Sequence, residues 1–345
     1  MRIAFLVRDD LKSISGGNIF NSRLIDHLRF EGDQVEVVKV PRGPFSPALY
    51  RKLSVAEYDL VLEDEMAFNS LGLLNRLLKK KKTISIVAVV HILFSVDDPA
   101  FREAEKGFLR SVDGMIFNSQ DTKDHVERLL KGKSLSVLTY PGWDRFRQKG
   151  DIDNIRHKNV ADGPLKIIFL GNLLKRKGFH YLLKALAKLP PGSWRLEAAG
   201  RVDLEKKYAA EVKRSIKMLG LERSVTLLGP LAGEAVAEII QNHHLLVMPS
   251  LYEPFGIVYL EAMSFGLPVI ASIRGGAREI IGSGQEGFLV VPDKIDALAE
   301  KIAFFLNNRG KITEMGMNAW KRSREFPRWS SSMKRARDFL VKVLK

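Results

Sequence analysis

Short apolar runs alternate with amphipathic stretches along the whole chain, and this alternation constrains the fold more than any other feature. Runs such as 3–7, 84–90 and 245–248 have the length of buried strands, and the stretches between them repeat apolar residues with a helical period. Strands that are separated by helices build a parallel sheet with helices on both faces. The pattern therefore predicts an α/β fold.

The pattern is interrupted by one polar and charged segment, which runs from residue 148 to residue 163. A chain of 345 residues has the length of about two domains. We therefore expect two doubly wound, Rossmann-like domains that face a central cleft. Phe326-Pro327 breaks the helical pattern, and a basic helix follows it. The expected ranges are 1–150 for the N-terminal domain, 164–325 for the C-terminal domain and 326–345 for the C-terminal helix.

The composition excludes several classes of protein. The chain contains no cysteine, which excludes disulfides, thiolate metal sites and a cysteine nucleophile. The most apolar stretch, residues 84–96, includes a histidine and is shorter than the roughly 20 residues that a membrane-spanning helix needs. The apolar run at the N-terminus is too short for a signal peptide. We therefore expect a cytoplasmic protein.

The charge is strongly basic and uneven along the sequence. The net charge is +15, and the last 45 residues alone contain 12 basic and 3 acidic residues, a net charge of +9. Such a balance indicates an anionic partner, which can be a nucleotide, an acidic membrane surface or a nucleic acid. No helix-turn-helix, ribonucleoprotein or zinc pattern is present, so we expect no nucleic-acid partner. A solvated basic surface explains scattered lysines equally well.

One segment of the second half has an informative composition at the start of a predicted helix. It runs from residue 249 to residue 263 and follows the apolar strand 245–248. Pro254 fixes the backbone where the helix begins, and Gly256 allows another group to approach the main chain closely. The unpaired N–H groups at such a helix N-terminus favour a phosphate or a diphosphate.

This segment contains two glutamates, Glu253 and Glu261, which are eight residues apart. If helical, the eight residues from one to the other span roughly 12 Å, so the two carboxylates are too far apart to share a metal ion. The spacing suits two hydrogen-bond acceptors at opposite ends of a nucleotide sugar, with the diphosphate between them. Glutamate near a helix start also has a purely structural explanation.

A second cluster follows the first predicted strand of this half. A glycine turn at Gly171 leads to three successive cations, Lys175, Arg176 and Lys177, before the next helix. Cations at a helix N-terminus oppose the helix macrodipole, so an anion is expected to compensate them. A diphosphate leaving group fits, because Lys or Arg stabilises its developing charge. The alternative is a basic surface loop.

Two features of the first half also follow strands, where ligands bind in doubly wound sheets. Gly16-Gly17 lies after the first strand, and His91 directly follows the apolar strand 84–90. The alternatives are a flexible loop for the glycines and a structural role for the histidine.

The second half resembles the retaining GT-B glycosyltransferases of family four. The resemblance is carried by Glu253-Pro-Phe-Gly-Ile-Val-Tyr-Leu-Glu261 and the strand after it, by Gly275-Gly276 and by Gly287-Phe288-Leu289-Val290. These motifs and others upstream of them occur in the family's order over about 150 residues. Such an ordered set is far more specific than a single glycine-rich turn.

The resemblance implies a role for each matching position. Glu253 would contact the transferred sugar and Glu261 the ribose hydroxyls, while Lys177 would bind the diphosphate. The family usually has Arg directly after Gly171, whereas this chain has Asn172. Either Arg176 supplies that charge, or the leaving group is held by one cation fewer. The remaining expected donor contacts are the amides of Phe255, Gly256 and Ile257, the backbone at Gly17, and Arg201 beside the base.

We therefore expect a retaining, metal-independent hexosyltransferase without a cofactor, with His91 near the anomeric centre as a further catalytic residue. Its donor would be a nucleoside diphosphate sugar of the UDP or GDP type, and its acceptor a hydroxyl of a glycan or lipid-linked glycan. The alternative is a dinucleotide-dependent oxidoreductase, although no G-x-G-x-x-G turn followed by an acidic residue is present. In the family the C-terminal helix packs on the N-terminal domain. Its remaining cations would then attach the protein peripherally to the inner face of an anionic membrane.

Overall fold

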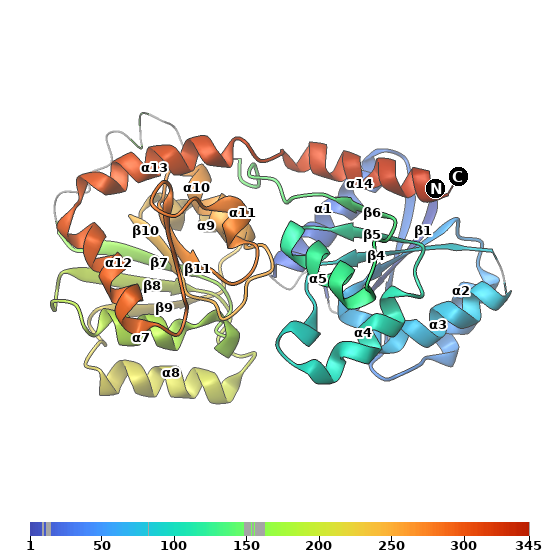
Figure 1. Cartoon of the computed structure of the whole chain (residues 1–345), viewed down its shortest axis with the longest axis horizontal. Coiled ribbons are helices and arrows are strands. Elements are labelled where there is room, and N and C mark those ends of the chain that lie inside the picture. Colours follow the sequence, from blue (N-terminus) through green and yellow to red (C-terminus); the bar gives the residue numbers. More distant parts are fainter. Residues whose placement is uncertain are drawn as a thin grey trace. The chain divides into compact units, whose positions relative to one another are not determined.

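The computed structural model describes residues 1–8, 10–11, 15–81, 83–147, 153, 155 and 163–344. The chain forms two compact units (Figure 1). The first consists of residues 1–141 and 328–345, and the second of residues 142–327. Among the described residues, no helix combines the length and the apolar character needed to cross a bilayer.

The first unit is built on a six-stranded parallel sheet with the order β2-β1-β3-β4-β5-β6. The predicted strands at 3–7 and 84–90 are confirmed as β1 and β4. The central strands are buried almost throughout, which explains their continuous apolar runs. The strands are β1 (Arg2–Val7), β2 (Gln34–Lys39), β3 (Leu60–Asp64), β4 (Ser85–Val90), β5 (Gly114–Phe117) and β6 (Ser136–Leu138).

Helices cover both faces of this sheet (Figure 1). One face packs against four helices through residues such as Leu49, Leu71, Phe108 and Val126. The helices on that face are α2 (Pro47–Val55), α3 (Phe68–Lys81), α4 (Arg102–Leu109) and α5 (Gln120–Leu130). The other helices of the unit are α1 (Gly16–Phe30), α14 (Trp329–Val343) and the short 3₁₀ helices η1 (Glu65–Ala67), η2 (Phe94–Val96) and η3 (Pro99–Phe101).

The C-terminal helix α14 packs within the first unit, beside α1 (Figure 1). Its apolar face is buried, and Phe339 lies so close to Gly114 that a Cβ there would come within 2.9 Å of the phenyl ring. Arg337 donates to the buried Asp33 carboxylate at 2.7 Å. Burial alone would raise the pKa of Asp33, but Arg337 and the N-terminal ammonium group outweigh it and lower that pKa. The helix is therefore held by both apolar packing and an ion pair.

The second unit has a six-stranded parallel sheet with the order β12-β11-β10-β7-β8-β9. The predicted strand 245–248 is confirmed as β10. Counted from the first strand of this unit, the order is that of the Rossmann fold, and it reverses direction between β7 and β10. The strands are β7 (Leu165–Leu170), β8 (Trp194–Ala199), β9 (Val225–Gly229), β10 (Leu245–Met248), β11 (Val269–Ser272) and β12 (Gly287–Val290).

The helices of the second unit form two groups (Figure 1). The helices α7 and α12 pack together beside α8, and α10 packs against α13 and α11. The 3₁₀ helix η4 lies between β7 and α7. Their bounds are η4 (Lys175–Lys177), α7 (Phe179–Leu186), α8 (Lys206–Met218), α9 (Glu234–Gln241), α10 (Ile257–Ser264), α11 (Ala277–Ile280), α12 (Ile295–Asn307) and α13 (Gly310–Ser323).

The first unit ends at Pro141 rather than at the expected residue 150. The second unit begins earlier because Trp143 is anchored in it. The Arg324 guanidinium lies 3.7 Å from the centroid of the Trp143 ring, and the backbone N–H of Trp143 donates to the Pro327 carbonyl oxygen at 3.3 Å. Most of the polar segment 148–163 lies outside the described residues. Within it, Ile155 is buried against Gly266 and Gly316.

Candidate functional site

The strand order of the second unit identifies where a ligand binds. In doubly wound sheets the crevice lies beyond the carboxyl ends of the two strands at which the order reverses, here β7 and β10. These strands are direct neighbours. The segments that follow them, residues 171–178 and 249–256, therefore emerge side by side. They are the two segments that the sequence singled out.

Glu253 and Lys177 form a buried ion pair at this position, and the two residues come from the two different segments. The Lys177 ammonium donates to Glu253 Oε2, and the Ser250 hydroxyl donates to the same oxygen at 3.2 Å. The Lys177 side chain is 14% exposed and the Glu253 side chain 9%. The structure thus brings together two of the three predicted catalytic residues.

Burial and charge oppose each other in this pair. Burial would raise the pKa of Glu253, but the charges of Lys177 and Arg176 outweigh it and lower that pKa. Burial also lowers the pKa of Lys177, and the neighbouring Arg176 adds to this, whereas Glu253 opposes it. Two cations therefore surround one carboxylate, and the local charge favours a further anion.

Arg176 has an unsatisfied donor at this site. Its Nη1 atom is buried and has no hydrogen-bond partner among the described residues. Its carbonyl oxygen accepts the N–H of Leu251 at 2.7 Å, which ties η4 to the segment after β10. A buried guanidinium N–H without a partner is costly, so the arrangement suits an acceptor supplied by a ligand.

Glycines hold the segments of this site backbone against backbone. A Cβ at Gly178 would lie 2.0 Å from the Pro249 carbonyl oxygen, and one at Gly276 would lie 2.3 Å from the Pro254 carbonyl oxygen. Gly256 has a positive φ of 89° immediately before α10, where no side chain caps the helix N-terminus. Ile257 begins that helix, and Phe255 is buried beside it. The N–H groups of this helix start can therefore bind an anion.

Glu261 lies deeper in α10 and has a different partner. Its side chain is 1% exposed, and its Oε1 atom accepts from Arg145 Nη1 at 2.5 Å. Arg145 was not among the residues predicted from the sequence. The structure therefore places the two glutamates of the motif in two separate ion pairs.

Asn172 and Arg201 are engaged in local contacts of the second unit. The Asn172 side chain accepts the N–H of Arg201 at 3.1 Å and so fixes the segment after β8. The Arg201 guanidinium binds Asp203 through both carboxylate oxygens, at 3.0 and 2.7 Å. Asn172 therefore stabilises backbone where the family usually has a cation, and Arg176 is the nearby cation of the site.

His91 lies in the first unit, at the end of β4, and both of its ring nitrogens are engaged. Asn118 donates its side-chain N–H to Nδ1 at 3.1 Å, so the ring proton sits on Nε2 and is donated to Asn21 Oδ1 at 3.0 Å. Burial lowers the pKa of His91, although the charge of Asp64 opposes this. The ring is therefore held neutral in one tautomer. Gly17 packs on it, since a Cβ there would come within 3.1 Å of the ring.

Two acidic residues beside His91 were not predicted from the sequence. In the first unit the strand order reverses between β1 and β3, so the end of β3 also belongs to a ligand-binding edge. Asp64 ends β3 and accepts from Asn21 at 2.8 Å. Glu65 follows it, and burial and the Asp64 carboxyl raise the pKa of Glu65 well above its ordinary value. Only the strand order could have indicated them.

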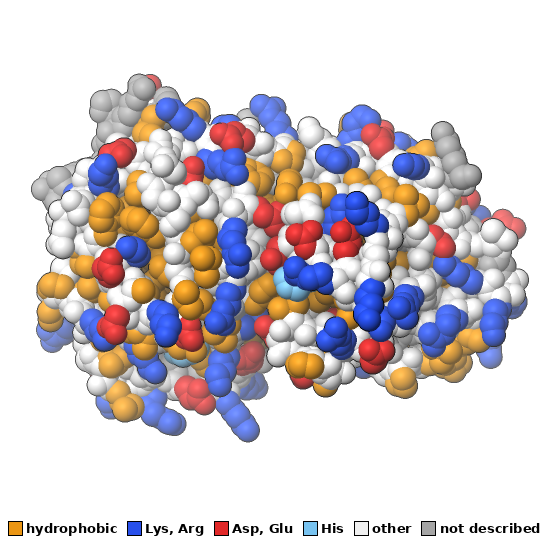
Figure 2. Space-filling view, in the orientation of Figure 1, with side chains coloured by type: hydrophobic (Ala, Val, Ile, Leu, Met, Phe, Trp, Pro, Cys, Tyr) orange, Lys and Arg blue, Asp and Glu red, His pale blue; other side chains and the backbone are white. Residues whose placement is uncertain are grey.

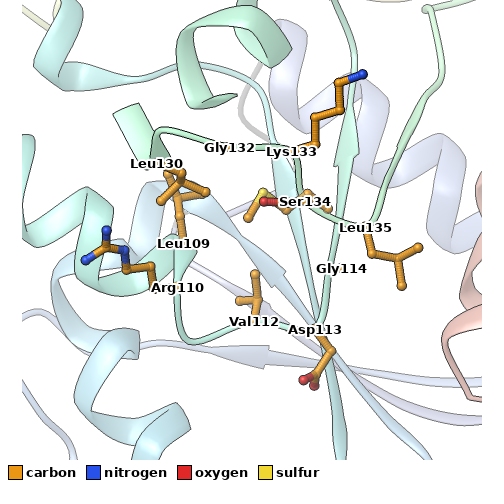
Figure 3. A pocket seen from close by; sticks show the side chains of 11 residues that line it. Leu109, Arg110, Val112, Asp113, Gly114, Leu130, Gly132, Lys133, Ser134 and Leu135 are labelled. Carbon is orange, nitrogen blue, oxygen red and sulfur yellow. The ribbon is translucent and has the colours of Figure 1, made fainter. Parts of the chain in front are cut away.

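A pocket of about 300 Å³ in the first unit lies elsewhere (Figure 3). It is lined by residues at the start of β5 and before β6, so it lies at the amino ends of these strands. Arg110, Asp113 and Lys133 point away from one another there (Figure 3). Its charged groups do not converge on one ligand, and we do not include it in the site.

The structure also bears on metal binding. Among the described residues, no three His, Asp or Glu side chains are grouped so that they could hold a metal ion. The cations Lys177 and Arg176 are the groups of the site that can meet a diphosphate.

Comparison with known proteins identifies the class of this fold. Sucrose-phosphate synthase of Thermosynechococcus elongatus superposes with a TM-score of 0.83 at 23% identity, covering 99% of this chain and 98% of that one. HepE of Anabaena, solved in complex with UDP and glucose, gives 0.81 at 23% identity, covering 99% of each chain. Two Rossmann-like units of this kind define the GT-B fold.

A sequence profile of the family described as glycosyl transferases group 1 matches residues 151–322, about half of the chain. The chain belongs to this family. An uncharacterized glycosyltransferase of Methanocaldococcus jannaschii is 34% identical over 180 residues, which are 52% of this chain and 45% of that protein. The D-inositol 3-phosphate glycosyltransferase of Nocardia farcinica is 26% identical, over 84% of this chain and 68% of that one.

The chain spans only part of several of these relatives, for example 45% of the archaeal protein and 59% of the alpha-D-kanosaminyltransferase of Streptomyces kanamyceticus. The alternative of a dinucleotide-dependent oxidoreductase was wrong, since the matching family and the relatives are glycosyltransferases.

Proposed function

We propose that this protein transfers a sugar from a nucleoside diphosphate sugar to an acceptor hydroxyl, with retention of the anomeric configuration and without a metal ion or cofactor. One observation carries the proposal: the buried Lys177–Glu253 pair, with Arg176 beside it, lies where β7 and β10 end. The donor is of the UDP or GDP type, and HepE, which shares the fold, was solved with UDP-glucose.

The second unit binds the donor. Lys177 and Arg176 hold the diphosphate, and the backbone N–H groups at Phe255, Gly256 and Ile257 bind its phosphate or the sugar. Glu253 accepts hydrogen bonds from hydroxyls of the transferred sugar. Further contacts come from Glu261 at the ribose hydroxyls, Arg201 beside the base and Gly17 in the first unit.

Arg176 supplies the positive charge that Asn172 does not provide. During transfer the bond between the anomeric carbon and the diphosphate oxygen breaks, and negative charge develops on that oxygen. Fixed cations aimed at this charge stabilise the transition state more than the ground state. Arg176 has a buried N–H donor without a partner among the described residues, so this donor can bind the diphosphate oxygen without losing an existing hydrogen bond.

His91 acts as a neutral group near the anomeric centre. Its ring is fixed by Asn118 and Asn21, and its pKa is lowered by burial. A neutral ring does not repel the positive charge that develops at the anomeric carbon as the leaving group departs. The acceptor hydroxyl oxygen then bonds to the anomeric carbon on the same face of the sugar, and its proton passes to the departing diphosphate oxygen.

The test combines donor screening with product analysis. Thermal unfolding with UDP-, GDP- and ADP-sugars identifies the donor, because a bound ligand raises the unfolding temperature. Nuclear magnetic resonance of the product reads the anomeric configuration. We expect retention, and full activity in EDTA. An inverted product, or activity lost in EDTA and restored by Mn²⁺ or Mg²⁺, would contradict the proposal.

We propose in addition a glycan or lipid-linked acceptor, and a cytoplasmic protein that attaches peripherally to an anionic membrane. On the face in Figure 2, Lys and Arg side chains are spread over both units and mixed with Asp and Glu. On α14, Lys334 and Arg337 pair with Asp338 and Asp33. The attachment is therefore weak and driven by charge, with each cation contributing about 1 kcal/mol near the surface.

Vesicle co-sedimentation tests this attachment. We expect binding to vesicles that contain anionic lipid, and release at high salt because the Debye length shortens. Equal binding to neutral vesicles, or binding that high salt leaves unchanged, would contradict a charge-driven mechanism.

A further inference from the structure

Glu261 is a carboxylate that α10 buries almost completely. Its side chain is 1% exposed, so little water can solvate its charge. A carboxylate in such a position needs a cation or several hydrogen bonds to offset its lost solvation. Arg145 provides the cation, with Nη1 donating to Oε1 at 2.5 Å. The two residues are 116 positions apart in the sequence.

Arg145 is held in place by its own segment. The Arg145 guanidinium lies 5.1 Å from the centroid of the Phe146 ring, and Phe146 packs on Phe265, directly after α10, at 6.0 Å. Two residues further on, the N–H of Arg147 donates to Glu234 at 3.0 Å. The segment 142–147 is therefore fixed along the second unit, and the Arg145 side chain, which is 15% exposed, loses little further freedom when it binds Glu261.

We propose that Arg145 is a positioning residue of the donor site, which holds the buried Glu261 carboxylate in the orientation in which it accepts hydrogen bonds from the 2′- and 3′-hydroxyls of the donor ribose. This inference rests on the proposed function, in which Glu261 binds the ribose. The reason is chemical. The hydrogen bond from Arg145 fixes the orientation of the carboxylate, whose two oxygens have further acceptor sites for hydroxyls. Hydrogen bonds to a charged acceptor are also the stronger ones.

The alternative is that Arg145 competes with the ribose for Glu261. Both residues are in direct contact in this structure, so the geometry alone allows either effect on affinity. The two readings predict opposite changes when Arg145 is removed. Positioning predicts weaker nucleotide binding, and competition predicts tighter binding.

The experiment is a binding cycle measured by calorimetry. UDP and GDP are titrated into the unmodified protein and into the variants Arg145→Met and Arg145→Lys. The control is Arg147→Met, whose exposed side chain lies in the same segment. Each is then titrated with the 2′,3′-dideoxy analogue of whichever nucleotide the unmodified protein binds. The ratio of the two affinities within one variant does not depend on how much of that variant is folded.

We expect Arg145→Met to weaken binding of the ribonucleotide about tenfold or more. Its binding of the dideoxy analogue should match that of the unmodified protein, because the hydroxyls through which Arg145 acts are absent. Arg145→Lys should recover part of the loss, and Arg147→Met should change neither affinity.

Tighter ribonucleotide binding by Arg145→Met would overturn the proposal in favour of competition. An equal loss for the ribonucleotide and the dideoxy analogue would also overturn it, since Arg145 would then act on something other than the ribose contact. Binding of neither UDP nor GDP by the unmodified protein would instead remove the proposed function, and this assignment with it.

Discussion

The two units share one architecture but present different chemistry at their ligand-binding edges. Both have six parallel strands, yet the order reverses between β1 and β3 in the first unit and between β7 and β10 in the second. At the second edge, Lys177 and Arg176 surround the single carboxylate of Glu253. At the first edge, the neutral His91 lies among side-chain amides and close to buried acids.

Under the proposed function, one sheet architecture would serve two partners. The second edge is built for an anion, because its cations outnumber its acids and one guanidinium donor lacks a partner among the described residues. The first edge has the neutral His91 ring among side-chain amides and buried acids, and we propose that the acceptor hydroxyl binds there. The two edges differ in the residues after their strands and not in their fold, so we expect these residues to determine what each edge binds.

The largest expected effect comes from removing charge at the second edge. Lys177→Met and Glu253→Gln should each lower turnover by about 10²- to 10³-fold, because each removes a contact that strengthens as the transition state forms. The control is Lys175→Met, whose exposed side chain lies in the same 3₁₀ helix. Steady-state kinetics at saturating donor reads the effect. Turnover within threefold of the unmodified protein for both variants would contradict the assignment.

The stability of the protein should depend on pH because of a buried acid in the first unit. Burial raises the pKa of Glu63, in β3, to about 8, although Asn75 and Lys79 oppose this. The unfolded carboxyl ionises above about pH 4.5, whereas the folded one stays protonated until about pH 8, so Glu63 costs increasing stability as the pH rises between these values.

Glu63→Gln removes this cost. We expect the variant to exceed the unmodified protein in free energy of unfolding by on the order of 3 kcal/mol at pH 8, with a smaller gain at pH 5. Urea unfolding at the two pH values measures both differences. The exposed Glu57→Gln serves as the control. A gain that is the same at both pH values would show that the carboxyl is ionised in the folded protein.

Asn118→Leu tests whether the fixed tautomer of His91 matters. The variant removes the donor to Nδ1 and so allows the ring proton to move from Nε2. We expect turnover to fall about tenfold, with nucleotide affinity unchanged because Asn118 is not among the proposed donor contacts. Kinetics and calorimetry on the same preparation separate the two quantities. A loss of nucleotide affinity would show that the first edge also contributes to nucleotide binding.

The smallest effect concerns the glycine that packs on His91. In a helix, Gly→Ala gains up to about 1 kcal/mol. At Gly107 in α4 the new Cβ meets nothing within 4 Å, whereas at Gly17 it lies 3.1 Å from the His91 ring. We expect Gly107→Ala to stabilise the protein, and Gly17→Ala to gain less and to lower turnover a few-fold. Equal stabilisation with unchanged turnover would mean that the His91 ring moves freely.

The strands could be predicted from the sequence because apolar runs are local. The positions of the candidate site residues after strands are equally local, and the roles of these residues stay predictions. The apolar runs at 84–90 and 245–248 mark buried strands, and Glu253 and Lys177 each stand directly after a strand. The Arg145–Glu261 pair could not be predicted, since it joins positions 116 apart and no pattern marks Arg145. The end at Pro141 was missed because Trp143 is anchored by tertiary contacts.

Asp64 and Glu65 were missed for a further reason. A periodic pattern indicates which segments are strands but not their order in the sheet, and the order alone places the end of β3 at a ligand-binding edge. The role of His91 was open for the same reason, because Asn21 and Asn118 meet it only in the folded protein.

The central claim is that Lys177 and Arg176 form a diphosphate site at the ends of β7 and β10. Its most direct test is calorimetric titration of the unmodified protein and of the double variant Arg176→Met/Lys177→Met with a nucleoside diphosphate and the corresponding monophosphate. We predict that the unmodified protein binds the diphosphate at least about tenfold more tightly, and that the double variant loses this preference while it still binds the monophosphate. An undiminished preference for the diphosphate in the double variant would contradict the account.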